Sequence, residues 1–367
     1  MKRKVGVLLT ILASATLLLL VFSPKAKASE NKTYEFWQKH ANVTWEYELD
    51  DNGNAINMRI KEYNSGISEW NSDEWMLSHG LDIPSEVNGH TVVSLGDGKN
   101  TIFGSVQEED GGHGSKVSYV RVPNTVKKIN AYAFYGKYEK CFDTIYLPDS
   151  LEEIGEYAFA YRYQNSYGLT IVSGGKENTL PSGLKKIEPY TFYYARIKPL
   201  QIPDNITEIG EYAFASATRN YTKTDDKDWM IGNNVKVIGD YAFNNTLSGE
   251  ITIPDSVIKI GRHSFGQSLI TSLKIGSGIT EISDYAFDHS SITELVIPEN
   301  IVRIGKNAFS DCDNLQSVTF SNGLKIIDNS AFEKCINLTS VVLPDSVTEL
   351  GTAVFYNCKN LKTAELG

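Results

Sequence analysis

Residues 209–214 read Ile-Gly-Glu-Tyr-Ala-Phe, and this phrase decides the fold because it recurs ten times along the chain. In every copy a phenylalanine follows the first aliphatic residue by five positions, and successive phenylalanines lie 22 to 33 residues apart. One unit of this length cannot bury its own apolar side chains, but stacked units can, so the repeat predicts a solenoid. The copies occupy residues 129–134, 154–159, 187–192, 209–214, 238–243, 260–265, 282–287, 304–309, 327–332 and 350–355.

A second phrase, found before most copies, predicts a strand. Residues 120–123 read Val-Arg-Val-Pro, and residues 251–254 read Ile-Thr-Ile-Pro. Alternating apolar and polar residues are typical of a strand, and a proline followed by Asp, Asn or Ser predicts that the strand ends in a turn. Stacked repeats then predict a parallel sheet along one side, with neighbouring strands about 4.8 Å apart. We therefore expect residues 104–367 to be mainly β, with short turns and helical pieces.

The last three copies add a cysteine followed by an Asn-Leu pair. Together they give the phrase Ala-Phe-x-x-Cys-x-x-Leu-x-x-Val-x-Leu-Pro-x-Ser. This phrase resembles the BspA-like family of leucine-rich repeat surface proteins, and the resemblance covers about residues 80–367. It implies a leucine-rich-repeat solenoid that adheres to a host protein, to matrix or to another cell. The earlier copies lack the cysteine and the Asn-Leu pair, and they carry insertions.

Residues 1–28 have the pattern of a secretory signal peptide. Basic residues 2–4 precede an apolar stretch at residues 5–22, and Ala26 and Ala28 supply the small residues that signal peptidase needs. We predict cleavage after Ala28. The alternative is an uncleaved membrane anchor, because the apolar stretch is at the lower limit for a spanning helix. Cleavage would place the protein outside a Gram-positive-like bacterium, secreted or at the cell surface, with no membrane span in the mature chain.

Residues 29–103 are expected to form an N-terminal β cap and a degenerate first coil. Residues 43–49 and 55–60 flank a cluster of turn-forming residues, which predicts a β-hairpin. Residues 81–93 resemble the first coil of the solenoid. A solenoid needs such a cover because an exposed first strand invites aggregation. Residues 64–79 show no clear period and receive no assignment.

The opposite end suggests an alternative function. Residues 363–366 look like the strand of one further repeat. Its open edge either pairs with a partner or is tolerated because it is short and acidic. Pairing there would make this an architectural protein that associates end to end.

The charge excludes one class of partner. The chain has 367 residues, of which 41% are hydrophobic, and its 45 acidic and 35 basic residues give a formal net charge of −10. A protein of this charge repels phosphate backbones, so we expect no nucleic-acid partner.

The cysteines predict a structural role. Cys312, Cys335 and Cys358 are each 23 residues apart and share one phase of the repeat. Because cysteine is among the most buried residue types, this spacing predicts a column of buried free thiols. Cys141 is out of phase. No Cys-x-x-Cys motif is present, so the sequence predicts neither a zinc site nor a redox site.

The histidines do not form a recognisable catalytic or metal-ligating set. His263 occupies a repeat position that tyrosine holds in most copies. His79, His90 and His113 lie in the irregular N-terminal part near acidic residues, without a ligand spacing. We expect no metal, no cofactor and no enzymatic activity. An enzyme that uses this His/acidic region is the lowest-ranked alternative, because no nucleophile–base–orienter set is visible.

The leading hypothesis is a binding module that recognises a protein or glycan of a host or neighbouring cell through its lateral face. Strand positions two and four residues before the proline should face solvent, and the insertions of the N-terminal half are rich in tyrosine. Exposed tyrosine and arginine provide contact area at modest entropic cost. Half-buried spacers are the alternative, which we expect for Tyr132, Tyr157, Tyr190 and Tyr212. The candidate ligand-binding residues are Tyr119, Arg121, Tyr146, Tyr161, Arg162, Tyr163, Tyr167, Tyr193 and Tyr194.

Overall fold

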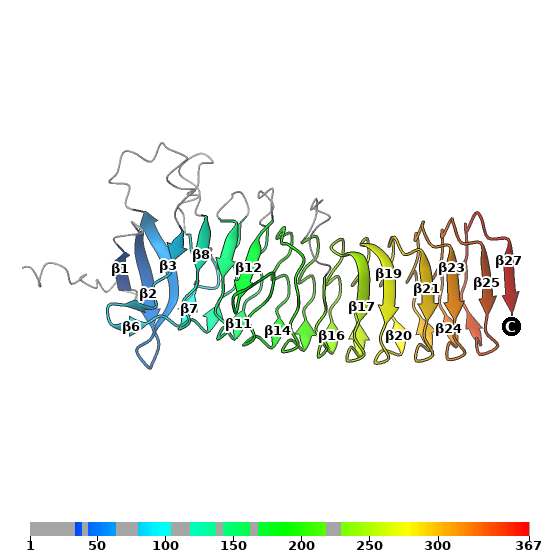
Figure 1. Ribbon diagram of the computed structural model, residues 1–367, viewed down its shortest axis with the longest axis horizontal. Coiled ribbons are helices and arrows are strands. Elements are labelled where there is room, and N and C mark those ends of the chain that lie inside the picture. Colours follow the sequence, from blue (N-terminus) through cyan, green and yellow to red (C-terminus); the bar gives the residue numbers. More distant parts are fainter. Residues whose placement is uncertain are drawn as a thin grey trace, which may run out of the picture.

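The chain forms an elongated rod of stacked coils with the N-terminal hairpin strands at one end (Figure 1). The computed structural model describes residues 34–38, 43–63, 80–103, 118–136, 142–161, 168–217 and 229–366. The predicted signal peptide at residues 1–28 lies outside this part of the chain. The predicted solenoid is confirmed, because strands of successive coils pair in parallel along the rod.

Each regular coil contains a longer strand, a proline turn, a two-residue strand and a second turn. In one coil the two strands are β17 (Ser248–Ile253) and β18 (Lys259–Ile260), and the chain then enters β19 (Leu269–Ile275) of the next coil. Ile251 lies opposite Leu273, and Ile253 lies opposite Ile275. A slip of one residue would turn these side chains to solvent, so burial fixes the register.

The longer strands form the parallel sheet that the repeat predicts along one side. They are β4 (Leu81–Asp82), β8 (Tyr119–Arg121), β10 (Thr144–Tyr146), β12 (Thr170–Ser173), β17, β19, β21 (Glu294–Ile297), β23 (Ser317–Phe320), β25 (Ser340–Leu343) and β27 (Thr363–Leu366). The sheet has three paired sections, β4–β8–β10–β12, β17–β19–β21–β23 and β25–β27. Isolated bridges through Gln201 lie between the first two sections.

The two-residue strands form a second parallel sheet in three paired sections, which the sequence did not predict. They are β7 (Ser94–Leu95), β9 (Lys128–Ile129), β11 (Glu153–Ile154), β14 (Lys186–Ile187), β15 (Glu208–Ile209), β16 (Val237–Ile238), β18, β20 (Glu281–Ile282), β22 (Arg303–Ile304), β24 (Ile326–Ile327) and β26 (Glu349–Leu350). Their outward residues often alternate in charge. Lys128 Nζ lies 2.8 Å from Glu153, and Arg303 Nη1 lies 3.4 Å from Glu281. Alternation avoids like charges at strand spacing.

The N-terminal strands extend the second sheet. β1 (Tyr34–Gln38), β2 (Val43–Leu49) and β3 (Ala55–Tyr63) pair antiparallel, and β3 then pairs in parallel with β7. Trp45, Tyr47 and Met58 of β2 and β3 are fully buried. The guanidinium of Arg59 on β3 contacts Glu46 of β2 and, at 2.8 Å, Asp97 of the first coil. The hairpin therefore covers the end of the solenoid both by apolar burial and by charge pairing.

Two short antiparallel hairpins are added to the first coils. β5 (Glu86–Val87) and β6 (His90–Thr91) pair antiparallel within the first coil. β13 (Lys176–Glu177) folds back antiparallel on β12 at the edge of the longer-strand sheet. The regular coils that follow carry no such additions among the residues that the structure describes.

A stack of ten phenylalanine rings forms the centre of the core. Neighbouring ring centroids are 5.1 to 5.7 Å apart, and the rings are within 17° of parallel. The rings belong to Phe134, Phe159, Phe192, Phe214, Phe243, Phe265, Phe287, Phe309, Phe332 and Phe355. The first nine are fully buried. The phenylalanine of the repeat phrase is thus the residue that each coil places on its neighbour.

The predicted column of buried free thiols is confirmed for Cys312, Cys335 and Cys358. Each Sγ donates to the carbonyl of the phenylalanine in the preceding coil, at 3.2 to 3.3 Å. These carbonyls belong to Phe287, Phe309 and Phe332 respectively. Burial raises the pKa of Cys312 to about 12. The thiols therefore act as buried hydrogen-bond donors. Cys141 lies outside the described residues.

The helical pieces that we expected are absent from the part of the chain that the structure describes, where turns take their place. A search of the same residues for a long apolar helix that could span a membrane found none.

Candidate binding surface

A column of stacked rings runs along the turns that follow the two-residue strands. Neighbouring centroids are 4.5 to 5.2 Å apart, and the ring planes are within 19° of parallel. The column consists of Tyr132, Tyr157, Tyr190, Tyr212, Tyr241, His263 and Tyr285, and we call it the tyrosine column. The prediction that His263 replaces a tyrosine is confirmed, and the column residues are half-buried, as expected.

The backbone of the column is left-handed, which the sequence did not reveal. All seven residues have φ between 49° and 61°, a region that favours glycine and asparagine over tyrosine. Hydrogen bonds to the next coil hold this conformation: Tyr190 N donates to Glu211 O at 2.9 Å, and Phe192 N donates to Ala213 O at 2.8 Å. Such bonds recur along the turns, so the surrounding structure determines each strained residue.

Three of the predicted candidates gather beside this column. The rings of Tyr161 and Tyr194 stack at 5.7 Å, and Tyr193 meets Tyr161 edge to face at 5.4 Å. Tyr135 approaches Tyr161 at 5.4 Å. We call these four residues the tyrosine cluster. Tyr135 was missed by the sequence reasoning, although its position three residues after Tyr132 matches that of Tyr193 after Tyr190.

The tyrosine cluster joins the column through Tyr193. Its ring lies 5.6 Å from Tyr190 and 5.9 Å from Tyr212, at 82° and 89° to those rings. Burial, with the neighbouring phenols, raises the pKa of Tyr193 to about 12 and that of Tyr212 to about 12. Both phenols are therefore neutral near pH 7, and they can donate as well as accept a hydrogen bond.

Carboxylates flank the column on one side. Glu156, Glu211 and Asp240 are exposed and directly precede Tyr157, Tyr212 and Tyr241 in the chain. The negative charges of Glu211 and Glu156 help to raise the pKa of Tyr190, after burial as the first cause. We call these three carboxylates the acidic rim. The sequence signal was available, since each occupies the x position of the repeated phrase, but it was not recognised.

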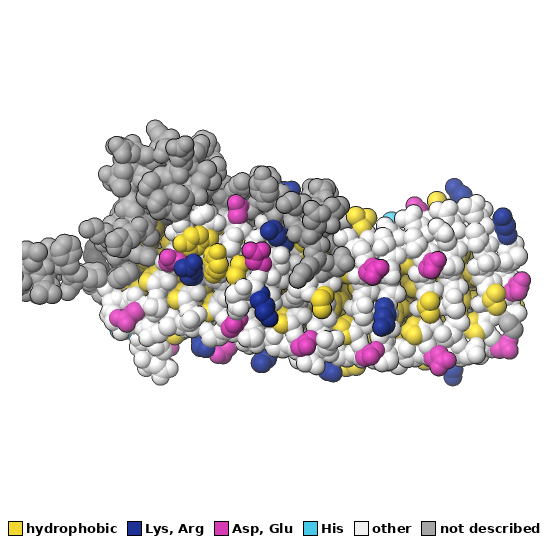
Figure 2. Space-filling view, in the orientation of Figure 1, with side chains coloured by type: hydrophobic (Ala, Val, Ile, Leu, Met, Phe, Trp, Pro, Cys, Tyr) yellow, Lys and Arg dark blue, Asp and Glu magenta, His cyan; other side chains and the backbone are white. Residues whose placement is uncertain are grey.

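A second group of predicted residues lies on the longer-strand sheet. The guanidinium carbon of Arg121 is 5.3 Å from the centroid of Tyr119 and 5.0 Å from that of Tyr146. The two rings meet edge to face at 5.7 Å. Arg121 Nη1 is 3.5 Å from Asp82 Oδ1 on β4. Figure 2 shows hydrophobic side chains gathered with charged ones over the N-terminal coils of this face.

The nine candidates therefore do not form one site. Tyr119, Arg121 and Tyr146 lie on the longer-strand sheet, whereas the tyrosine cluster lies on the turns after the two-residue strands. The remaining candidates, Arg162, Tyr163 and Tyr167, lie outside the described residues.

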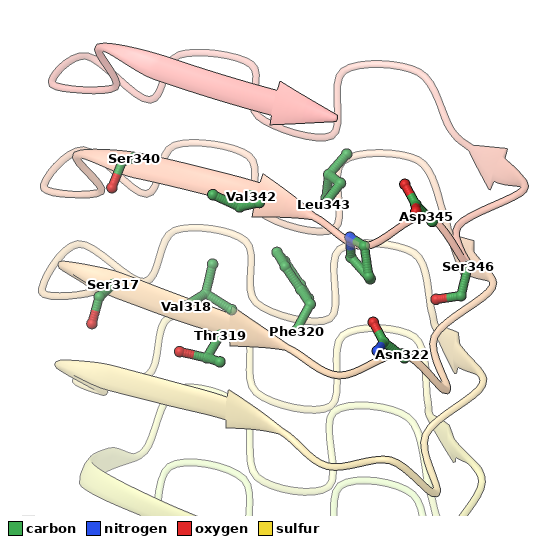
Figure 3. A pocket seen from close by; sticks show the side chains of 11 residues that line it. Ser317, Val318, Thr319, Phe320, Asn322, Ser340, Val342, Leu343, Asp345 and Ser346 are labelled. Carbon is green, nitrogen blue, oxygen red and sulfur yellow. The ribbon is translucent and has the colours of Figure 1, made fainter. Parts of the chain in front are cut away.

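The longer-strand sheet is interrupted between β23 and β25, where a shallow groove of about 700 Å³ opens. Figure 3 shows its lining, with Ser317 and Thr319 on one strand, Ser340 and Val342 on the next, and Phe320 between them. The sequence analysis did not predict this groove. Phe320 stands where most other coils have isoleucine, leucine or valine, and this is the signal that could have indicated it.

A buried carboxylate lies at the end of the tyrosine column. Asp288 Oδ1 is 3.1 Å from His263 Nδ1, and Oδ2 is 3.2 Å from His289 Nδ1. Two histidines thus share one carboxylate, which is 6% exposed. A search of the described residues found no group of three or more His, Cys, Asp or Glu that could hold a metal ion. His90 lies elsewhere, with Nδ1 2.7 Å from the carbonyl of Gly53, and His79 and His113 lie outside the described residues.

A family model described as a BspA-type leucine-rich repeat region matches the chain in overlapping segments at residues 113–216, 172–249 and 236–362, with six copies of the repeat. Together these segments cover more than half of the chain. No curated protein matches the chain by sequence.

One solved structure above a TM-score of 0.5 shares the fold, and two further leucine-rich repeat structures match over most of the chain. The pneumococcal vaccine antigen PcpA superposes with a TM-score of 0.51 at 19% identity, over 94% of this chain and 82% of that one. A leucine-rich cell surface protein of Faecalibacterium prausnitzii gives a TM-score of 0.48 at 20% identity, over 95% and 96% of the two chains. A leucine-rich repeat protein of Bacteroides ovatus gives 0.48 at 20% identity, over 88% and 92%.

Proposed function

Because the chain belongs to the BspA-type leucine-rich repeat family, we propose that it is a secreted or surface-associated bacterial module that binds an extracellular protein or glycan. The predicted signal peptide supports export, and the names of its structural relatives include a cell surface protein and a vaccine antigen. Repeats of this type form binding or scaffold surfaces, so the proposal assigns no chemical reaction to the chain.

The observation that carries the proposal is the tyrosine cluster beside the tyrosine column. Tyrosine supplies a large, rigid contact area and a hydroxyl for hydrogen bonding, at the entropic cost of two side-chain torsions. Here much of that cost is met in the free protein, because Tyr161, Tyr193 and Tyr194 already hold one another in place. A preformed surface loses less entropy when a partner binds.

The backbone beneath the cluster is equally preformed. Tyr161 N donates to Tyr193 O at 2.8 Å, and Tyr194 N donates to Ala215 O at 3.0 Å. The side chains thus sit on turns that are bonded across coils, on a stack of buried phenylalanines. Arg121, held against the rings of Tyr119 and Tyr146, offers a second preformed contact on the longer-strand sheet.

The test is a screen of the protein against arrays of matrix proteins, host-cell proteins and glycans, repeated with two triple variants. Tyr161→Ser, Tyr193→Ser and Tyr194→Ser together should weaken the affinity for the partner about tenfold or more, since interface tyrosines are frequent hot spots. The control combines Thr252→Ala, Ser272→Ala and Thr363→Ala, which are exposed on the longer-strand sheet and do not line the groove. It should leave the affinity unchanged. If the tyrosine variant binds every partner as the parent does, the assignment of the surface is wrong.

A further inference from the structure

We propose that the tyrosine column and the acidic rim together bind a basic segment of a partner protein, rich in arginine and lysine. This inference rests on the proposed function and narrows its partner to one chemical class.

The surface offers hydrogen-bond acceptors and negative charge. The phenols of Tyr157, Tyr190, Tyr212 and Tyr241 follow one another in steps of 4.6, 4.9 and 4.5 Å. The acidic rim accompanies three of these four rings. Guanidinium and ammonium groups carry donors and no acceptor, whereas carboxylates only accept, so the rim suits a cationic side chain better than a neutral or acidic one.

The rim carboxylates are not neutralised by the protein itself. None of Glu156, Glu211 and Asp240 forms an ion pair with a side chain in the described parts of the chain. Asp240 Oδ1 accepts the backbone N–H of Arg262 at 2.9 Å. Two lysines of the two-residue strands, Lys128 and Lys186, are paired with other carboxylates. Their partners are Glu153, 2.8 Å from Lys128, and Glu188, 2.7 Å from Lys186.

The molecule contains a related contact with an arginine. Arg121 lies against two tyrosine rings, at 5.3 and 5.0 Å, with Asp82 Oδ1 3.5 Å from its Nη1. An arginine that lies against aromatic rings and pairs with a carboxylate combines cation–π attraction with a charged hydrogen bond. In the tyrosine column stacking covers the ring faces, so a cationic side chain would instead meet phenol oxygens and the carboxylates of the acidic rim.

The coil of His263 marks the C-terminal limit of the surface. At the position of the rim carboxylates this coil has Arg262, whose guanidinium carbon lies 5.7 Å from the ring of Tyr285. Here the chain supplies its own cation to the column. The surface open to a foreign cation therefore extends from Tyr157 to Tyr241, a distance that an extended peptide of about four residues spans at about 3.4 Å per residue.

The experiment measures binding of fluorescent peptides to the full protein by anisotropy at low and moderate salt. The probes are an arginine-serine peptide, a glutamate-serine peptide and a glycine-serine peptide of the same length. Only the arginine peptide should bind, and added salt should weaken it because the contacts are exposed charges.

Two triple variants separate the acidic rim from overall charge. The combination of Glu156→Gln, Glu211→Gln and Asp240→Asn should weaken the arginine peptide about tenfold, the sum expected for three exposed ion pairs. The combination of Glu250→Gln, Glu294→Gln and Glu365→Gln removes the same charge from exposed positions of the longer-strand sheet and should change the affinity less than twofold.

Three results would overturn the inference. Equal losses in the two variants would mean non-specific attraction to an acidic protein. Equal binding of the neutral peptide would mean that charge is not recognised. A glycan from the arrays that binds at the rim more tightly than the arginine peptide would assign the surface to another class of ligand. In each case a partner that is lost in the tyrosine triple variant would still support the proposed function.

Discussion

The N-terminal and C-terminal coils of the rod have the same core and different turns. The phenylalanine stack runs from Phe134 to Phe355 without interruption, whereas the tyrosine column ends at Tyr285. In the last three coils its position is held by Asn307, Ser330 and Ala353, with φ of 53°, 57° and 58°. The left-handed turn therefore forms without an aromatic ring. The tyrosines are not required by the backbone, which leaves them available for recognition.

One buried hydrogen bond is common to both regions, although cysteine donates it in the C-terminal coils and serine donates it in an earlier coil. Cys335 Sγ lies 3.2 Å from the carbonyl of Phe309 in the C-terminal region. In an earlier coil Ser268 Oγ donates to the carbonyl of Phe243 at 3.1 Å. A buried carbonyl needs a donor, and either group supplies one. The thiol column is thus a variant of a structural contact, consistent with the burial of its sulfur atoms.

The largest expected effect tests whether the core is the same in both regions. Phe192→Ala and Phe309→Ala should each lower the free energy of unfolding by about 3–5 kcal/mol, because each leaves a cavity in a close-packed stack. Guanidinium denaturation followed by circular dichroism measures both. A clear loss for one variant and none for the other would show that the two regions do not share one core.

A smaller effect tests what the tyrosine column adds to stability. Tyr212→Asn keeps a residue that tolerates the left-handed region but removes ring contacts at 4.9 and 4.5 Å. We expect a loss of about 1–3 kcal/mol, since each stacked pair contributes about 0.5–1.5 kcal/mol. The matched control, Ser330→Asn, lies at the same position of a C-terminal coil and should cost nothing measurable. If both variants are equally stable, the column contributes to recognition alone.

A further effect, visible only at alkaline pH, is a loss of stability that comes from the tyrosine-rich region. Burial raises the pKa of Tyr193 and of Tyr212 to about 12, from about 10 in an unfolded chain. Between these values the folded state keeps protons that the unfolded state has lost, so stability falls as pH rises from about 10 to about 12. Denaturation midpoints across this range, with tyrosinate absorbance, measure it. The double variant Tyr193→Phe and Tyr212→Phe should show a shallower fall, and an unchanged slope would contradict the assignment.

Much of the fold could be predicted because the repeat expresses one physical constraint. The phenylalanine period, the alternating strands and the phase of the three cysteines all follow from burial in identical coils. The second sheet was not predicted because its strands have only two residues, too few to show a period. The expected helical pieces were wrong because bonds within the turns, such as Tyr193 N to Tyr190 O at 3.1 Å, alternate with bonds to the next coil, such as Phe192 N to Ala213 O at 2.8 Å.

The candidate residues were predicted less well than the fold. The exposure of Arg121 could be read from its alternation with buried neighbours, and the alternation is confirmed. The association of Tyr161 with Tyr193 and Tyr194 could not be predicted from the sequence, because 32 residues separate Tyr161 from Tyr193. The carboxylates of the acidic rim can be found in the sequence, but only the structure shows that they accompany a column of stacked rings. The groove at Phe320 depends on how far two strands separate, and the phenylalanine in the sequence marks the place without specifying that separation.

By itself the sequence determined that the chain stacks in register, which residue types form the core, and which strand positions face outward. These properties repeat in every coil, so ten imperfect copies specify them together. Only the tertiary structure decided which side of the coil each tyrosine occupies, which carboxylates stay unpaired beside the rings, and where the sheet opens. Those properties depend on contacts between coils of unequal length, whose relative positions follow from the folded path of the chain rather than from spacing along it.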